Sequence, residues 1–156
     1  MINYDKPHQI HAYDAKYEAQ KISLAPIAFQ AARCLIKFGI LKYIDAGNKS
    51  GVTLKTLTEK CSISEYGVHV LVDMGLSMRL VWQKGDRYIL DKTGHFLLHD
   101  TMAIRNLNFV HDVCYKGLFE LEASIKNGKP EGLKEFGDWP TIYNGLSKLP
   151  EEAHDS

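Results

Sequence analysis

The chain has 156 residues, of which 45% are hydrophobic, so it is long enough to bury a core. Its 19 lysines and arginines equal its 19 aspartates and glutamates. Because binding to nucleic acid or to anionic membranes depends on excess positive charge, this balance argues against both partners. The amino terminus is too polar for a signal peptide, and no stretch approaches the roughly 20 apolar residues of a membrane span. Three widely spaced cysteines without a Cys-x-x-Cys pair indicate reduced thiols, so we expect a soluble cytoplasmic protein.

The first quarter of the chain predicts an arm followed by a long helix. Residues 1–22 form the polar amino-terminal arm or helix, and SLAPIAFQAARCLIKFGILKYIDAG follows it. Ser23 is the expected N-cap, Pro26 is tolerated in the first turn, and Gly47 marks the end. Only a narrow polar stripe interrupts its apolar surface, which indicates a helix buried on several sides.

The next segment predicts two short helices and a hairpin. TLKTLTEKC has Thr53 as its cap, and SISEYGVHVLVDMGLSMRL has Ser62 and Glu65 spaced as a capping box. In LVWQKGDRYIL, β-branched and aromatic residues flank a Lys-Gly-Asp turn, which is typical of a hairpin. Three helices followed by a hairpin have the order of a winged helix-turn-helix, and DKTGHFLLHD predicts a short closing helix. We therefore expect a winged-helix domain over residues 23–100.

A further long helix is predicted from Thr101 to about Asn127, with Gly128 ending it. Its apolar residues recur every three or four positions and extend well beyond one seam. A small domain cannot cover so wide an apolar surface, so we expect a partner helix from a second copy of the chain. The expected interface residues of this homodimer are Leu107, Val110, Cys114, Leu118, Leu121 and Ile125.

The carboxyl-terminal residues contain turn residues and an aromatic pair, Trp139 and Tyr143, spaced i, i+4. Residues 101–149 thus combine a long helix with an aromatic connector that completes the expected dimer interface. A Pro-Glu-Glu run near residue 150 is typical of a helix start. We expect residues 150–156 to begin a linker to a further domain.

The expected reading face of the winged helix lacks the charge of a DNA reader. Residues 64–78 contain no lysine or arginine, but they contain Glu65 and Asp73. Between residues 53 and 91 basic and acidic side chains are equal in number, so little counterion release is available. Lys84 and Arg87 on the wing are the best remaining candidates for phosphate contacts.

We predict no catalytic, cofactor-binding or metal-binding residue in this chain. His95 and His99 are spaced i, i+4, and a second pair near the amino terminus is spaced i, i+3, but neither has the flanking residues of a zinc motif. His111 and Asp112 are neighbours, which point apart on a helix. No Gly-x-Gly occurs, so the glycine-rich turn of a nucleoside cofactor site is missing.

Taken in order, these segments resemble a known family. The apolar helix LAPIAFQAARCLIKFGILKYI, the winged helix, DKTGHFLLHD, GLFELEASIKNGKPEGL and WPTIYNGLSKLP are similar to the N-terminal dimerisation domain of S-adenosylmethionine-dependent O-methyltransferases. The resemblance covers residues from about 22 onward. It implies a mainly α fold, a winged helix-turn-helix with a small β-hairpin wing and additional long helices that build an intertwined homodimer. A separate catalytic domain then follows in the parent enzyme.

The resemblance implies that the chain provides homodimerisation and substrate capping in a parent enzyme that uses S-adenosylmethionine to methylate a small molecule. We expect the chain itself to bind no cofactor and to be inactive alone. Substrate-pocket candidates are Phe109, His111, Tyr115, Trp139 and Tyr143. Two alternatives stay open: a winged-helix transcriptional regulator that binds DNA, and a stand-alone interaction module that uses residues 101–127.

Overall fold

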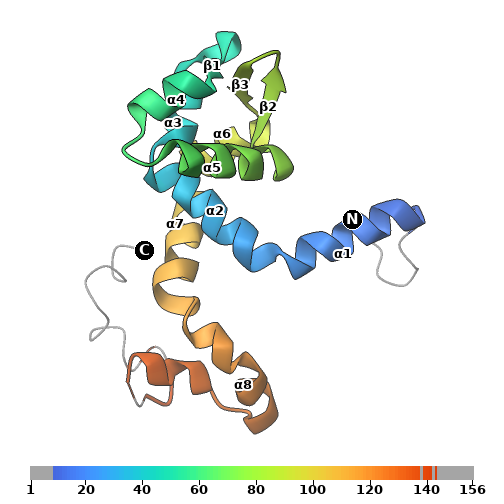
Figure 1. The fold of residues 1–156 in the computed structure, drawn as a ribbon. Helices are drawn as coiled ribbons and strands as arrows, with labels where there is room; N and C mark the ends of the chain where they lie inside the picture. Colours follow the sequence, from blue (N-terminus) through green and yellow to red (C-terminus); the bar gives the residue numbers. More distant parts are fainter. Residues whose placement is uncertain (1–8, 138, 142, 144–156) are drawn as a thin grey trace. The chain divides into compact units, whose positions relative to one another are not determined.

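The structure is a computed structural model that describes residues 9–137, 139–141 and 143. The chain divides into two compact units, residues 1–91 and 92–156. Helices dominate, and the described strands form one small antiparallel sheet (Figure 1). The predicted mainly α fold with a small hairpin is therefore confirmed. No helix in the described part of the chain combines the length and apolar character needed to cross a membrane.

The first unit begins with three helices, α1 (Ala12–Ser23), α2 (Ala25–Lys37) and α3 (Ile40–Ala46). The prediction of one long helix over this region is wrong. Ser23 ends α1, where its hydroxyl donates to the carbonyl of Ala19 instead of capping a helix start. Gly39 interrupts the second half with a φ of 74°, a conformation that glycine adopts at no steric cost.

The winged-helix-like part follows as β1 (Val52–Thr53), α4 (Leu54–Lys60), α5 (Glu65–Ser77), β2 (Val81–Lys84) and β3 (Arg87–Leu90). Thr53 caps α4 as predicted, accepting from the backbone N–H of Thr56 at 3.3 Å. The predicted Ser62–Glu65 capping box is wrong, because α5 starts later and Ser64 accepts from the N–H of Gly67 at 3.1 Å.

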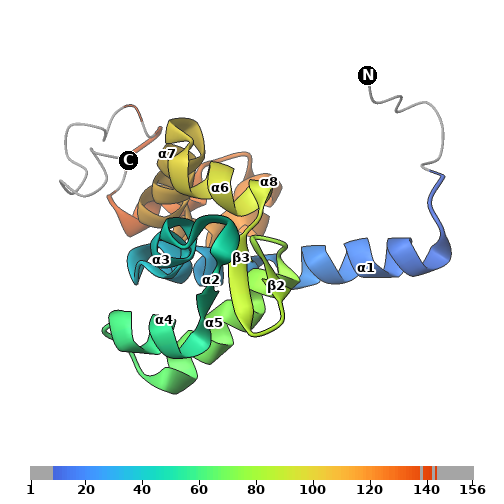
Figure 2. The same cartoon turned by 90° about the horizontal axis from the view of Figure 1, so that it is seen from above.

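The predicted hairpin is confirmed. Strands β2 and β3 pair in antiparallel register, with Val81 opposite Leu90, and Gly85 turns between them with a φ of 61°. The sheet order is β1-β3-β2. Helix α5 packs on α2 and on β2, and α3 packs on β3, so the sheet closes one side of the helical cluster (Figure 2).

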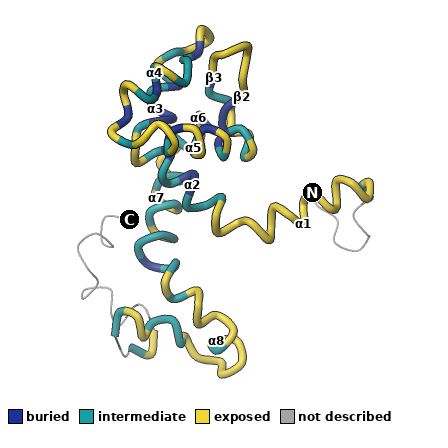
Figure 3. The backbone as a smooth tube through the Cα atoms, in the orientation of Figure 1, coloured by how far each residue is buried: buried dark blue, intermediate teal, exposed yellow. Residues whose placement is uncertain are grey.

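The core of the first unit lies between these packed elements (Figure 3). Its most deeply buried side chains come from α2, α3, α4 and α5. They are Leu35, Ile40, Leu41, Ile44, Leu57, Val68 and Val72. Helix α1 contributes nothing to this core, because none of its residues is buried.

The second unit contains α6 (Lys92–His99), α7 (Thr101–Phe109) and α8 (Leu121–Asn127). Helix α6 confirms the predicted short closing helix. The prediction of one helix from Thr101 to Asn127 is wrong, because a π-helical turn (Val110–Cys114) and a 3-10 turn (Gly117–Glu120) separate α7 from α8. Gly128 ends α8 with a φ of 62°, as predicted. The linker predicted at residues 150–156 lies outside the described residues.

Candidate functional site

The expected dimer interface residues fall into two groups on the second unit. Leu107, Val110 and Cys114 are half-buried. Leu118, Leu121 and Ile125 are 48%, 51% and 75% exposed. The π-helical turn, which contains Val110 and Cys114, changes the helical register before the second group: the N–H of Tyr115 donates to the carbonyl of Val110 at 2.7 Å, a step of five residues instead of four. The six residues therefore do not form the continuous helical seam that their spacing predicts.

Further apolar side chains lie at the surface of each unit. Phe119, beside the second interface group, is exposed. Tyr13, Tyr17 and Ile22 are exposed on α1, in the segment predicted to be a polar arm or helix. The i, i+4 spacing of Tyr13 and Tyr17 on one helix is the sequence pattern that indicates this apolar surface. Exposed apolar residues of this number are candidates for a protein interface.

Two of the five substrate-pocket candidates come together at the π-helical turn. The rings of His111 and Tyr115 lie 6.2 Å apart between centroids, and both residues are half-buried. The Nε2 atom of His111 lies 3.9 Å from Oδ1 of its neighbour Asp112, although helical neighbours are expected to point apart. The turn thus gathers an imidazole, a carboxylate and a phenol on one short segment.

The other three candidates lie elsewhere. Phe109 and Tyr143 are exposed. Trp139 lines a hollow of about 570 Å³ in the second unit. The side chains around this hollow are mainly charged residues and prolines, namely Lys129, Pro130, Glu131, Lys134 and Pro140.

Glu131 is held by its neighbours at this hollow. The Lys134 ammonium pairs with its carboxylate, and the amide of Asn127 donates to Oε1 at 3.1 Å. The hydrogen bond from Lys134, followed by that from Asn127, lowers the pKa of Glu131. The two hydrogen bonds tie this carboxylate to both sides of the turn that follows α8.

The segments on either side of α8 also touch through their backbones. A Cβ at Gly117 would lie 2.9 Å from the carbonyl oxygen of Gly132, and a Cβ at Gly132 would collide with the carbonyl of Gly117. Only glycine at both positions allows this approach. The contact folds the chain back after α8.

Two cysteines are unsuited to nucleophilic chemistry. Burial raises the pKa of the Cys61 thiol and that of the Cys114 thiol. Because the thiolate is the reactive form, neither side chain is activated as a nucleophile at neutral pH.

The face of the winged-helix-like part that a DNA reader would use is apolar and acidic. Helix α5 exposes Tyr66, Val70 and Asp73. On the wing, Arg87 donates from Nη1 to the carbonyl of Gly51 at 3.2 Å, so this guanidinium helps to hold β1. Of the two basic wing residues, one is thus engaged within its own fold.

The described residues do not fit an S-adenosylmethionine site. A nucleoside cofactor is usually held where a parallel strand meets a helix through a glycine-rich turn. All three strands described here are antiparallel, and the longest has four residues.

Comparisons with known proteins agree with this fold. Residues 16–88 match the model of the Dimerisation2-like domain family. The fold is similar to that of the S-adenosylmethionine-dependent methyltransferase SibL in its apo form, with 12% identity and a TM-score of 0.72 over 86% of this chain and 40% of SibL. It is also similar to the pyocyanin biosynthetic protein PhzM, with 14% identity and a TM-score of 0.71 over 91% of this chain and 42% of PhzM.

The chain thus spans about two fifths of the length of either solved structure. No curated protein sequence matches it significantly. The TM-scores show that the chain shares its fold with part of each solved structure, and the family match indicates the type of domain. Together these findings bear out the resemblance to an N-terminal dimerisation domain, and the family match covers residues 16–88, slightly less than half of the chain.

Proposed function

We propose that this chain is the homodimerisation and substrate-capping domain of an S-adenosylmethionine-dependent O-methyltransferase and is not catalytic by itself. The observation that carries the proposal is the match of residues 16–88 to the Dimerisation2-like domain family. In this proposal residues 1–22 are an arm, residues 23–100 the winged-helix domain and residues 101–149 the rest of the interface. Residues 150–156 lead toward a catalytic domain.

The exposed apolar side chains support self-association. Leu118, Phe119, Leu121 and Ile125 gather on α8 and the turn before it, and α1 exposes aromatic residues of its own. Obligate dimers commonly bury on the order of 2,000–5,000 Å² of mainly apolar surface. A second copy of the chain would cover these residues and gain the free energy of removing them from water.

The capping role belongs to the π-helical turn. Half-buried His111 and Tyr115 offer a polar edge and an aromatic face to a small methyl acceptor, and Phe109, Trp139 and Tyr143 are further candidates for its walls. Orientation of the acceptor is what an in-line methyl transfer needs from such groups. The methyl donor would be held by the catalytic domain of the parent enzyme.

The proposal is tested by pairing two versions of the chain. A tagged copy and an untagged copy are co-expressed, and the tagged copy is purified. With equal expression and random pairing, we expect about half as much untagged as tagged copy to be recovered, and titration calorimetry to detect no binding of S-adenosylmethionine. Recovery of the tagged copy alone would contradict the dimer, and tight cofactor binding would contradict the division of labour.

The two alternatives predict different results. A DNA-binding regulator would shift duplex DNA in a mobility assay at low salt, and Arg87→Glu would abolish the shift. The equal numbers of basic and acidic residues in the chain, and the apolar and acidic side chains that α5 exposes, argue against this outcome. A stand-alone interaction module would be monomeric by itself.

A further inference from the structure

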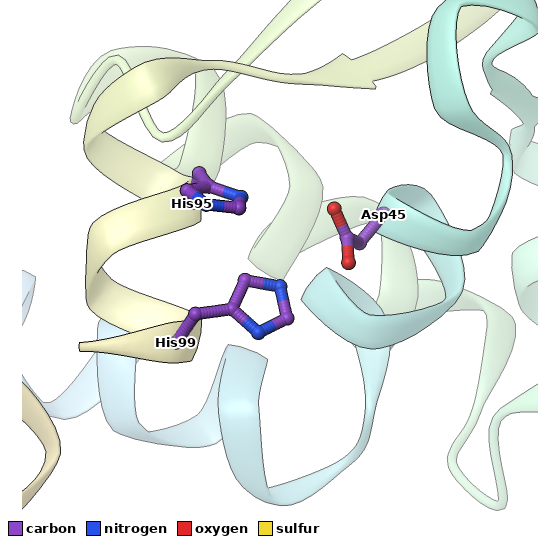
Figure 4. A group of neighbouring side chains, drawn as sticks. All are labelled: Asp45, His95 and His99. Carbon is purple, nitrogen blue, oxygen red and sulfur yellow. The ribbon is translucent and has the colours of Figure 1, made fainter. Parts of the chain in front are cut away.

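Helix α6 carries two imidazoles on the same side, one helical turn apart. Figure 4 shows His95 and His99 on this helix; Asp45, which the figure also labels, belongs to α3 of the first unit. The two rings lie 4.6 Å apart between centroids, with their planes inclined by 47°. One ring nitrogen of each histidine lies within 4.8 Å of the other's. The i, i+4 spacing seen in the sequence is thus realised as a facing pair.

We propose that His95 and His99 form a two-histidine chelate for a divalent transition metal ion of the zinc class. Nitrogen ligands lie about 2.0–2.1 Å from zinc, so two of them on one tetrahedral ion are roughly 3.3 Å apart. Both side chains are exposed, so small χ rotations close the remaining gap without moving the backbone. Water or a carboxylate completes the coordination.

The ligand type defines which ions this pair takes. Imidazole nitrogens suit zinc, nickel and copper, whereas magnesium and calcium require oxygen ligands. The proposal departs from the sequence-based expectation of no metal-binding residue, which depended on missing flanking motif residues. It also goes beyond the proposed dimerisation role, because neither interface group includes α6.

Calorimetric titration of the chain with Zn²⁺ tests the proposal. We expect His99→Gln and His95→Gln each to weaken one Zn²⁺ binding event by at least about tenfold, which corresponds to about 1.4 kcal/mol. The matched controls are His69→Gln on α5 and His11→Gln before α1, both exposed histidines, which should leave that event unchanged. Mg²⁺ should give no binding heat.

Thermal unfolding provides a second readout that also reports whether each variant folds. Zn²⁺ binds the folded helix, in which the rings face each other, so it should raise the midpoint of the natural chain in a concentration-dependent way. The midpoint of folded His99→Gln should respond less. The proposal is overturned if the natural chain binds no Zn²⁺ at millimolar concentration, or if the α6 variants and the controls respond alike.

Discussion

The two units differ in how many of their apolar side chains are buried. Among the described residues, every buried apolar side chain except Val113 lies in the first unit. Both units expose large apolar side chains, but the second unit, which exposes Phe119 and Ile125, lacks a comparable buried core among the described residues. A buried apolar core stabilises a unit by itself. Apolar side chains that stay exposed on a helix are removed from water only when a second surface packs on them. In the proposed dimer, a second copy of the chain would cover exposed apolar side chains of the second unit.

The largest expected effect is the difference in unfolding free energy between replacing a leucine in the core and replacing a leucine at the surface. Leu35 is fully buried and lies close to Gly75 of α5. Leu35→Ala should lower the free energy of unfolding by about 2–5 kcal/mol at every protein concentration. Its matched control, Leu121→Ala in the second unit, should lose stability only as far as dimer formation contributes, so its loss should vary with protein concentration.

Urea unfolding at several protein concentrations measures both variants. A concentration-independent loss for Leu121→Ala as large as that for Leu35→Ala would mean that the second unit also has a closed core.

The next effect concerns the dimer itself. Leu118→Glu places a charge on the exposed apolar surface before α8, where a partner would cover it. We expect the dimer to weaken by at least about thirtyfold, or about 2 kcal/mol, as for the central residue of an interface. Sedimentation velocity measures this change. Lys126→Glu on α8 also adds an acid, but at a polar position, and should change the dimer little. If Leu118→Glu stays as dimeric as the natural chain, the interface lies elsewhere.

A smaller effect distinguishes the observed cap of α5 from the predicted one. Ser64 accepts from the N–H of Gly67, so Ser64→Ala should cost about 1 kcal/mol of unfolding free energy. Ser62 is exposed and lies before the cap, so Ser62→Ala should stay within about 0.5 kcal/mol of the natural chain. If both variants lost the same unfolding free energy in chemical denaturation, the result would support the Ser62–Glu65 capping box that the sequence predicts.

The smallest effect is local to the second unit. Because the hydrogen bonds from Lys134 and Asn127 lower the pKa of Glu131, its carboxylate stabilises the turn above the unfolded pKa, about 4.3. That contribution is lost as the pH falls through the folded pKa. An NMR titration should show Glu131 protonating below the ordinary glutamate range, and Lys134→Ala should move its pKa upward. Titration of Glu131 at the ordinary value in the natural chain would show that these hydrogen bonds do not hold it.

Local chemistry made part of the fold predictable. Three features depend only on the local conformation of one residue and were therefore predictable. They are the hairpin turn at Gly85, the start of α4 at Thr53 and the end of α8 at Gly128. The Ser23 and Gly39 breaks were missed because apolar periodicity continues through both positions. A glycine inside an apolar helical pattern does not by itself predict that the helix is interrupted.

The π-helical and 3-10 turns within residues 110–120 could not be predicted from the sequence for a different reason. The close approach of Gly117 and Gly132 joins positions that no helical or strand period relates. The sequence identified His111 and Tyr115 as candidates, but their pairing follows a π-helical turn that has no sequence pattern of its own. The sequence therefore predicts these two residues as candidates, but not that their rings lie side by side.

The most direct test of the central claim is the molar mass of the natural chain in solution, measured by light scattering over a range of micromolar concentrations. We predict twice the mass of one chain throughout, because the exposed apolar residues of the second unit are covered by a second copy. The mass of a single chain across the whole range would contradict the proposed dimerisation function.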